Sequence, residues 1–248
     1  MFIAASTECF PDLELRAAIE LASDLEFTAV EIAIHETGDV QPSEILTDMD
    51  RSIQLLRYTH RLDIAGYSVQ LASTGQQHYE DFAKLCWLAK TTKVVTLTVP
   101  SAEKGTPFNE EVEHLQKLVE CGDAEGVRVS VKSQLGCLSE DPDTLMVLCN
   151  NVDGLGITLD PSVYITGSAK GKNLDNILKF VCNVHLRDTR PDAFQVSVGQ
   201  GEVDYGKLIT QLEREKYDRA LTVNMFPLEG LDHRVELRKL RRLLETLV

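Results

Sequence analysis

Two hydrophobic periods alternate along the whole chain. Short runs with an apolar residue at every second position are followed by longer stretches in which apolar residues recur every three or four positions. The first pattern is typical of strands and the second of amphipathic helices. The pattern predicts strands over residues 2–8, 28–35, 64–71, 94–99, 127–133, 155–160, 182–188 and 221–226. It predicts helices over residues 11–25, 43–61, 77–91, 108–122, 142–150, 173–180, 204–215 and 232–247.

Eight strand–helix units follow one another, and no Pro-, Gly- or Ser-rich linker divides them, so residues 1–248 are predicted to form a single domain. Strict alternation of strands and helices predicts a parallel sheet. Eight units in 248 residues favour a closed (β/α)8 TIM barrel over an open doubly wound sheet. No G-x-G-x-x-G follows the first strand, which argues against a dinucleotide-binding domain. We therefore expect an α/β fold whose eight parallel strands form a closed sheet.

The polar positions within the predicted strands are equally regular. Side chains alternate between the two faces of a strand, and in a barrel one face meets the helices while the other fills the lumen. In the second strand, Val30, Ile32 and Ile34 form the apolar face, so Glu31 and His35 point inward. The same alternation sends these polar residues inward from the other strands: Ser6, Glu8, Ser68, Gln70, Thr96, Thr98, Lys132, Asp160, Asn183, His185, Arg187, Thr222 and Asn224.

Charged side chains inside a barrel need partners or a ligand, because burying them alone costs too much free energy. Active sites of this fold lie at the carboxyl ends of the strands. The inward polar residues expected at that rim are Glu31, Gln70, Lys132, Asp160, His185, Arg187 and Asn224, with His35 beside them. The sequence therefore predicts a polar pocket for a small hydroxylated or carboxylated molecule.

Charge and cysteine usage narrow the classes of partner. The net charge of -14 repels phosphate backbones and anionic lipid, so we expect neither nucleic acid nor a membrane as a partner. No 18-residue apolar run and no basic, signal-like N-terminus are present. The six cysteines form no C-x-x-C pair and mostly sit in apolar runs, which predicts free thiols in a cytoplasmic protein and no zinc–cysteine site.

Three segments in the second half of the chain resemble motifs of one known family. They are LDPSV at residues 159–163, VHLRD at 184–188 and GQGEVDY at 199–205. Their order and strand placement are similar to those of the xylose-isomerase-like barrels, which include sugar phosphate isomerases and epimerases, hydroxypyruvate isomerases and endonuclease IV. The resemblance covers the whole chain in layout, with its specific motifs between residues 127 and 227.

The resemblance implies a metal site that this sequence only partly retains. In active epimerase-type members, two glutamates, an aspartate and a histidine hold a divalent metal, and the glutamates move the proton beside a carbonyl. The matching positions here are Lys132, Asp160, His185 and Asn224, so both glutamates are replaced. Two ligands rarely hold a divalent ion tightly and an ammonium group opposes it, so we assign no metal ligand, although Mn, Zn or Mg at a degenerate site stays open. We expect the Lys132 ammonium to occupy the place of the cation, paired with Asp160 and Glu31.

Two functions remain open at this point. The first is an isomerase or epimerase acting on a small sugar or hydroxy-keto acid, in which Lys132 supplies positive charge or forms a Schiff base and His185 or Glu31 is the base. The second is a non-catalytic barrel that binds a sugar or metabolite, with Lys132 as a structural ion-pair partner. The candidate catalytic residues are Lys132, His185, Asp160 and Glu31, and the candidate substrate-binding residues are Arg187, Gln70, Asn224 and His35. A DNA-repair nuclease is disfavoured by the acidic charge and by Gln70, and the resemblance is compatible with a homodimer.

Overall fold

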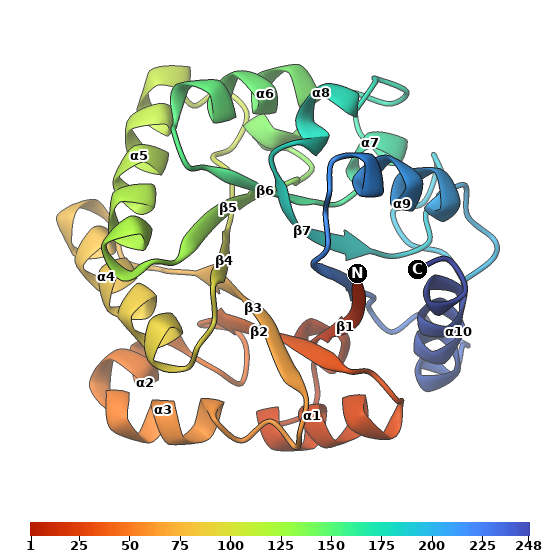
Figure 1. The fold of residues 1–248 in the computed structure, drawn as a ribbon, viewed down its shortest axis with the longest axis horizontal. Coiled ribbons are helices and arrows are strands. Elements are labelled where there is room, and N and C mark those ends of the chain that lie inside the picture. Colours follow the sequence, from red (N-terminus) through yellow and green to blue (C-terminus); the bar gives the residue numbers. More distant parts are fainter.

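The computed structural model describes residues 1–248, and its eight strands form a closed, all-parallel barrel in the order of the sequence (Figure 1). The last strand closes on the first, with Phe2 opposite Ala220 and Ala5 opposite Val223. The strands are β1 (Phe2–Ser6), β2 (Ala29–His35), β3 (Asp63–Gln70), β4 (Thr96–Val99), β5 (Arg128–Lys132), β6 (Gly156–Leu159), β7 (Val181–Leu186) and β8 (Ala220–Val223). The predicted (β/α)8 barrel is confirmed.

Helices surround the barrel on the outside, as Figure 1 shows. They are α1 (Leu15–Asp24), α2 (Pro42–Thr47), α3 (Met49–Leu56), α4 (Gly75–Thr91), α5 (Phe108–Glu125), α6 (Pro142–Asn151), α7 (Val163–Thr166), α8 (Asp175–Leu178), α9 (Tyr205–Arg214) and α10 (His233–Glu245), with 3-10 turns η1 (Thr7–Cys9) and η2 (Leu138–Glu140). Their apolar faces and the outward faces of the strands share one core cluster of 59 buried residues. No helix is both long enough and apolar enough to traverse a lipid bilayer.

The end of the first strand differs from its prediction. The period of two was expected to continue to residue 8, but β1 ends at Ser6 and Thr7–Cys9 form the turn η1. The Ser6 hydroxyl accepts a hydrogen bond from the backbone N–H of Glu8 at 3.3 Å and so caps this turn. The side chain of Glu8 consequently projects from a turn at the carboxyl end of the barrel and not from a strand.

Two predicted helices also have different bounds. The helix expected over residues 43–61 is broken at Asp48, where the backbone is not helical (φ −139°, ψ 83°) and the carboxylate caps α3 through the N–H of Arg51 at 3.0 Å. The helix expected from residue 11 begins at Leu15, whose N–H is bound by the carboxylate of Asp39 at 2.6 Å. In both places a side-chain cap, which hydrophobic periodicity does not encode, sets the boundary.

The alternation of faces is confirmed inside the barrel. Val30, Ile32 and Ile34 are buried in the outer core. In the lumen, the hydroxyls of Thr98 and Thr158 are hydrogen-bonded at 2.8 Å, and other hydroxyls and amides continue this polar layer toward the carboxyl ends. A polar lumen therefore leads up to the rim. All six cysteines are free thiols, and five of them are buried.

Candidate active site at the carboxyl ends of the strands

A cavity of about 330 Å³ opens at the carboxyl ends of the strands. Five of the eight residues selected from the sequence line it: His35, Gln70, Lys132, Asp160 and Arg187. The structure adds Glu8 to them, together with two aromatic side chains from loops, Phe194 and Phe226. A second cavity of about 290 Å³ lies next to the first and shares Glu8, His35 and Phe226 with it.

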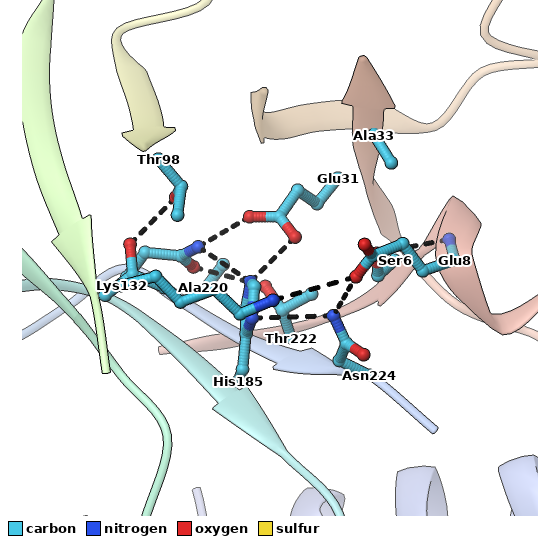
Figure 2. Close-up of polar contacts among 12 residues, drawn as sticks. Ser6, Glu8, Glu31, Ala33, Thr98, Lys132, His185, Ala220, Thr222 and Asn224 are labelled. Carbon is cyan, nitrogen blue, oxygen red and sulfur yellow. Dashed lines mark hydrogen bonds and ion pairs between the residues drawn. The ribbon is translucent and has the colours of Figure 1, made fainter. Parts of the chain in front are cut away.

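The other three selected residues lie deeper in the barrel and do not line the cavity. Glu31, His185 and Asn224 are all 0% exposed. The Nε2 of His185 lies 2.7 Å from Oε2 of Glu31, an ion-pair distance without the alignment of a hydrogen bond, while Oε1 of Glu31 accepts from the amide of Asn183 at 2.7 Å. The amide oxygen of Asn183 accepts in turn from the hydroxyl of Thr222 at 3.2 Å. These contacts form a polar floor beneath the cavity (Figure 2).

Glu8 and Lys132 face each other across the cavity. Oε2 of Glu8 lies 3.8 Å from Nζ of Lys132, and both side chains are about one-fifth exposed, at 22% and 23%. The same oxygen accepts a hydrogen bond from the amide of Asn224 at 2.7 Å (Figure 2). Burial alone raises the pKa of Glu8, but the charge of Lys132 and the Asn224 hydrogen bond outweigh it, so its pKa is lowered overall. Glu8 is therefore ionised at neutral pH.

The partner expected for Lys132 was wrong. We expected the ammonium to pair with Asp160 and Glu31, but it pairs with Glu8. Asp160 is already bound by Arg187, and Glu31 by His185. The alternation had placed Glu8 on the inward face, so the sequence contained a signal for it. Without knowing that β1 ends in a turn, we had no reason to choose Glu8 over Asp160 and Glu31 as the partner of Lys132.

Arg187 is buried and lies beside Asp160. One terminal nitrogen lies 3.1 Å from Oδ2 of Asp160 and donates to the side-chain oxygen of Asn224 at 3.2 Å. Its Nε and Nη1 have no hydrogen-bond partner. The guanidinium carbon lies 4.6 Å from the ring centre of Phe194 and 5.1 Å from that of Phe226, a geometry that favours cation–π attraction. The two rings thus cover an arginine that retains unused donors.

The loop after β7 is held by Asp188. Its Oδ2 accepts from the backbone N–H of Gly199 at 2.7 Å and from that of Gly201 at 3.0 Å. Gly199 has a positive φ of 88°, and a Cβ at Gly201 would overlap the carboxylate of Asp188. The G-x-G segment therefore folds a loop tightly around one aspartate. In the same loop, the hydroxyl of Thr189 donates to the carbonyl of Phe194 at 3.0 Å.

The family of the chain follows from comparison with known proteins. A family model described as xylose isomerase-like TIM barrel matches residues 19–245. The chain belongs to this family. No curated protein matches it in sequence.

Solved structures share the fold of this xylose isomerase-like barrel over nearly its whole length. A D-tagatose 3-epimerase-like protein superposes with a TM-score of 0.76 at 16% identity, covering 100% of this chain and 98% of that chain. The IOLI protein, solved with a zinc atom, gives 0.76 at 17% identity, covering 100% and 99%. D-psicose 3-epimerase from Clostridium cellulolyticum H10, solved with D-tagatose, gives 0.76 at 13% identity, covering 100% and 99%. At these identities the likeness establishes the fold alone.

The charged residues of the site are arranged as three acid–base pairs: Glu8–Lys132, Glu31–His185 and Asp160–Arg187. Only the first pair has both side chains partly exposed. Nowhere in the chain do three or more His, Cys, Asp or Glu side chains converge as a metal site requires. The cavity therefore offers one carboxylate and one ammonium group to a ligand, and a covered guanidinium beside them.

Proposed function

We propose that this protein is an isomerase or epimerase that acts on a small sugar or hydroxy-keto acid without a resident divalent metal. One observation carries the proposal: an ammonium group, Lys132, stands in the cavity opposite the carboxylate of Glu8 and makes no hydrogen bond within the chain. A positive charge fixed beside a carbonyl oxygen stabilises the negative charge that develops when a neighbouring C–H proton is removed. The family membership supports a reaction of this class.

The donor set does not fit the metal that the family resemblance implies. At the four matching positions, Lys132 presents a cation and Asn224 an amide that is engaged with Glu8 and Arg187. Asp160 is bound to Arg187, and His185 is bound to Glu31. A divalent ion at this point would have to displace two fixed positive charges, which like-charge repulsion opposes. We therefore derive no step through a metal.

The remaining selected residues support the proposal in different ways. Gln70 and His35 line the cavity, where they can donate to or accept from substrate hydroxyls. Asp160 fixes the position of Arg187. Glu31 and His185 are fully buried, which supports a role in holding the floor of the site in place more than direct contact with substrate. Free, mostly buried thiols support the cytoplasmic location that we propose.

Replacement of Lys132 tests the function. We expect Lys132→Met to lower kcat by about 100-fold or more, because the developing oxyanion loses its cation. The assay measures aldose–ketose and epimer interconversion over a panel of D-pentoses, D-hexoses and hydroxypyruvate. The control is Lys84→Met, which changes a lysine on α4 that is 53% exposed and does not line the cavity. Unchanged turnover in Lys132→Met would show that the Lys132 ammonium does not stabilise the developing oxyanion.

A second function is favoured by the pairing of the charges. Every carboxylate of the site already has a basic side chain as its partner within the chain, which suits a barrel that binds a sugar or metabolite without converting it. This alternative predicts saturable binding of a panel sugar, measured by calorimetry, and no interconversion of that sugar. Interconversion by the unmodified protein at any rate above that of Lys132→Met would exclude it.

A further inference from the structure

We infer that Glu8 is the general base of this site, and that it moves a proton between neighbouring carbons on one face of the substrate. The reaction would then be an aldose–ketose type isomerisation and not an epimerisation. This inference rests on the proposed function and narrows it to one reaction class. It is carried by the position of Glu8 and by the groups on the opposite wall of the cavity.

Glu8 has one carboxylate oxygen fixed and one free. Both contacts of its carboxylate, the Asn224 hydrogen bond at 2.7 Å and the Lys132 ion pair at 3.8 Å, go to Oε2. Oε1 makes no hydrogen bond within the chain, and the side chain lines both cavities. A base needs an accessible lone pair and a fixed direction, and this arrangement provides both. Figure 2 shows the Lys132 ammonium directed toward the carboxylate of Glu8, with the amide of Asn224 reaching the same carboxylate.

The electrostatic environment keeps this carboxylate in its reactive form. The pKa of Glu8 is lowered because the Lys132 charge and the Asn224 hydrogen bond outweigh its burial. A carboxylate of lowered pKa is a weak base, so it needs an acid partner that makes the C–H proton easier to remove. Lys132 is placed to be that partner, since its ammonium lies within 4 Å of the base and reaches the same cavity.

The proton transfer balances with these two groups alone. Glu8 Oε1 takes the proton from C2 of an α-hydroxy aldehyde. The C–H electron pair forms a C1=C2 bond, and the carbonyl π pair moves to O1, which receives a proton from Lys132. Lys132 then regains a proton from the O2 hydroxyl as C2=O2 forms. The C1=C2 pair takes the proton back from Glu8 at C1, so both side chains return to their starting states.

Epimerisation would need a second proton carrier on the opposite face of the substrate. Glu8 and His35 both stand at the ends of adjacent strands β1 and β2, so they approach from the same side. The opposite wall, at the ends of β5 and β6, offers Lys132 and Asp160. The Lys132 ammonium lies 3.8 Å from the Glu8 carboxylate and serves the substrate oxygens, so it is not a base for a carbon-bound proton on the far face. Asp160 is 1% exposed and engaged through both oxygens, by Arg187 at 3.1 Å and by the N–H of Ser162 at 3.0 Å. One carboxylate is therefore free to act, and it acts from one face.

Isotope transfer tests the inference. The purified protein is incubated in ordinary water with D-xylose and D-glucose deuterated at C2, and the products are analysed by NMR. We expect ketose that carries part of the deuterium at C1, because one base that removes and returns the same proton transfers some of it before exchange with solvent. Glu8→Gln should lower kcat by about 100-fold or more with a smaller change in KM, as for loss of a general base.

Two variants separate chemistry from folding. Glu8→Ala should regain part of its activity when formate is added, since a free carboxylate can enter the space left by the side chain. The control is Glu229→Gln, an exposed glutamate in the loop after β8. Thermal unfolding of each variant shows whether the fold is intact.

Each outcome decides a different point. Isomerisation with retained label, lost in Glu8→Gln and rescued by formate, supports the inference. Turnover of Glu8→Gln within about three-fold of the unmodified protein, or epimers formed with solvent hydrogen only, overturns it and leaves the proposed function standing. If the unmodified protein binds the sugars but converts none of the panel, the proposed function and the inference both fall.

Discussion

Asn224 connects the charged groups of the site. Its amide nitrogen donates to Glu8 at 2.7 Å and lies 3.4 Å from Nδ1 of His185, and its oxygen accepts from Arg187 at 3.2 Å. It is 0% exposed and does not line the cavity, so it acts on a substrate through Glu8 and Arg187. In the family resemblance this position belongs to a glutamate, and here an uncharged side chain at the same point orients Glu8, which comes from the turn η1 after β1.

Replacing Asn224 should therefore change a pH profile. The hydrogen bond from Asn224 favours the ionised form of Glu8, so in Asn224→Ala the pKa of Glu8 rises from its lowered value. The acidic limb of the kcat/KM profile should move to higher pH by a measurable fraction of a unit. The charged groups facing Glu8, Lys132, His35 and His185, are unchanged by this substitution and still hold part of the lowering.

The matched control is Asn150→Ala, at an exposed position of α6. It should leave the acidic limb in place. A limb that stays fixed in Asn224→Ala, with kcat/KM lowered equally at all pH values, would show that Asn224 has only a structural role.

At the scale of elements, loops at the carboxyl end of the barrel are joined by buried carboxylates. Glu140 of η2 is 4% exposed, and it accepts from the N–H of Gly136 and from the N–H and hydroxyl of Ser168, each at 2.6 Å. Lys104, from the loop after β4, lies 2.8 Å from it. A single carboxylate therefore holds the loops that follow β4, β5 and β6, which are the loops beside Lys132 and Asp160.

Glu140→Gln should destabilise the protein in a pH-dependent way. Burial alone raises the pKa of Glu140, but the ion pair with Lys104 and the hydrogen bonds from Ser168 and Gly136 hold this pKa at about 2, well below the ordinary value of a glutamate. A lowered pKa stabilises the fold above the unfolded pKa, and the stabilisation is lost as pH falls toward about 2. We expect a loss of about 2 kcal/mol at neutral pH, after allowance for solvent around Lys104, which is 46% exposed.

Urea unfolding of both proteins at neutral pH and at low pH measures this difference. The difference in free energy of unfolding between the unmodified protein and Glu140→Gln should decrease steadily as the pH is lowered. A gap that is constant with pH would mean that the variant loses packing and not the interactions of an ionised carboxylate.

At the scale of the whole molecule, the barrel and its lumen could be predicted because a period of two records which face of a strand is buried. That period placed Lys132, Asp160 and Arg187 correctly toward the cavity. It could not select partners, since the pairing of Lys132 with Glu8 depends on a turn capped by Ser6. It also missed Phe194, which lies on a loop, where no periodicity applies and where long-range contacts decide the position of a side chain. Phe226 was the last residue of the predicted eighth strand, but β8 ends at Val223 and Phe226 lies in the loop that follows.

The barrel also keeps the four positions that the family resemblance assigns to a metal, so we expect that two substitutions can introduce metal binding there. Changing Lys132→Glu and Asn224→Glu together removes the cation and restores two carboxylates beside Asp160 and His185. Without metal, the added negative charge near Glu8 should lower the melting temperature. With Mn²⁺ in about 100-fold excess over its dissociation constant, the double variant should gain about 3 kcal/mol, whereas the unmodified protein should gain little. Thermal unfolding with and without Mn²⁺, and elemental analysis of protein purified without chelators, measure both effects. Equal stabilisation of the two proteins, or stoichiometric metal in the unmodified one, would mean that Lys132 does not replace the cation.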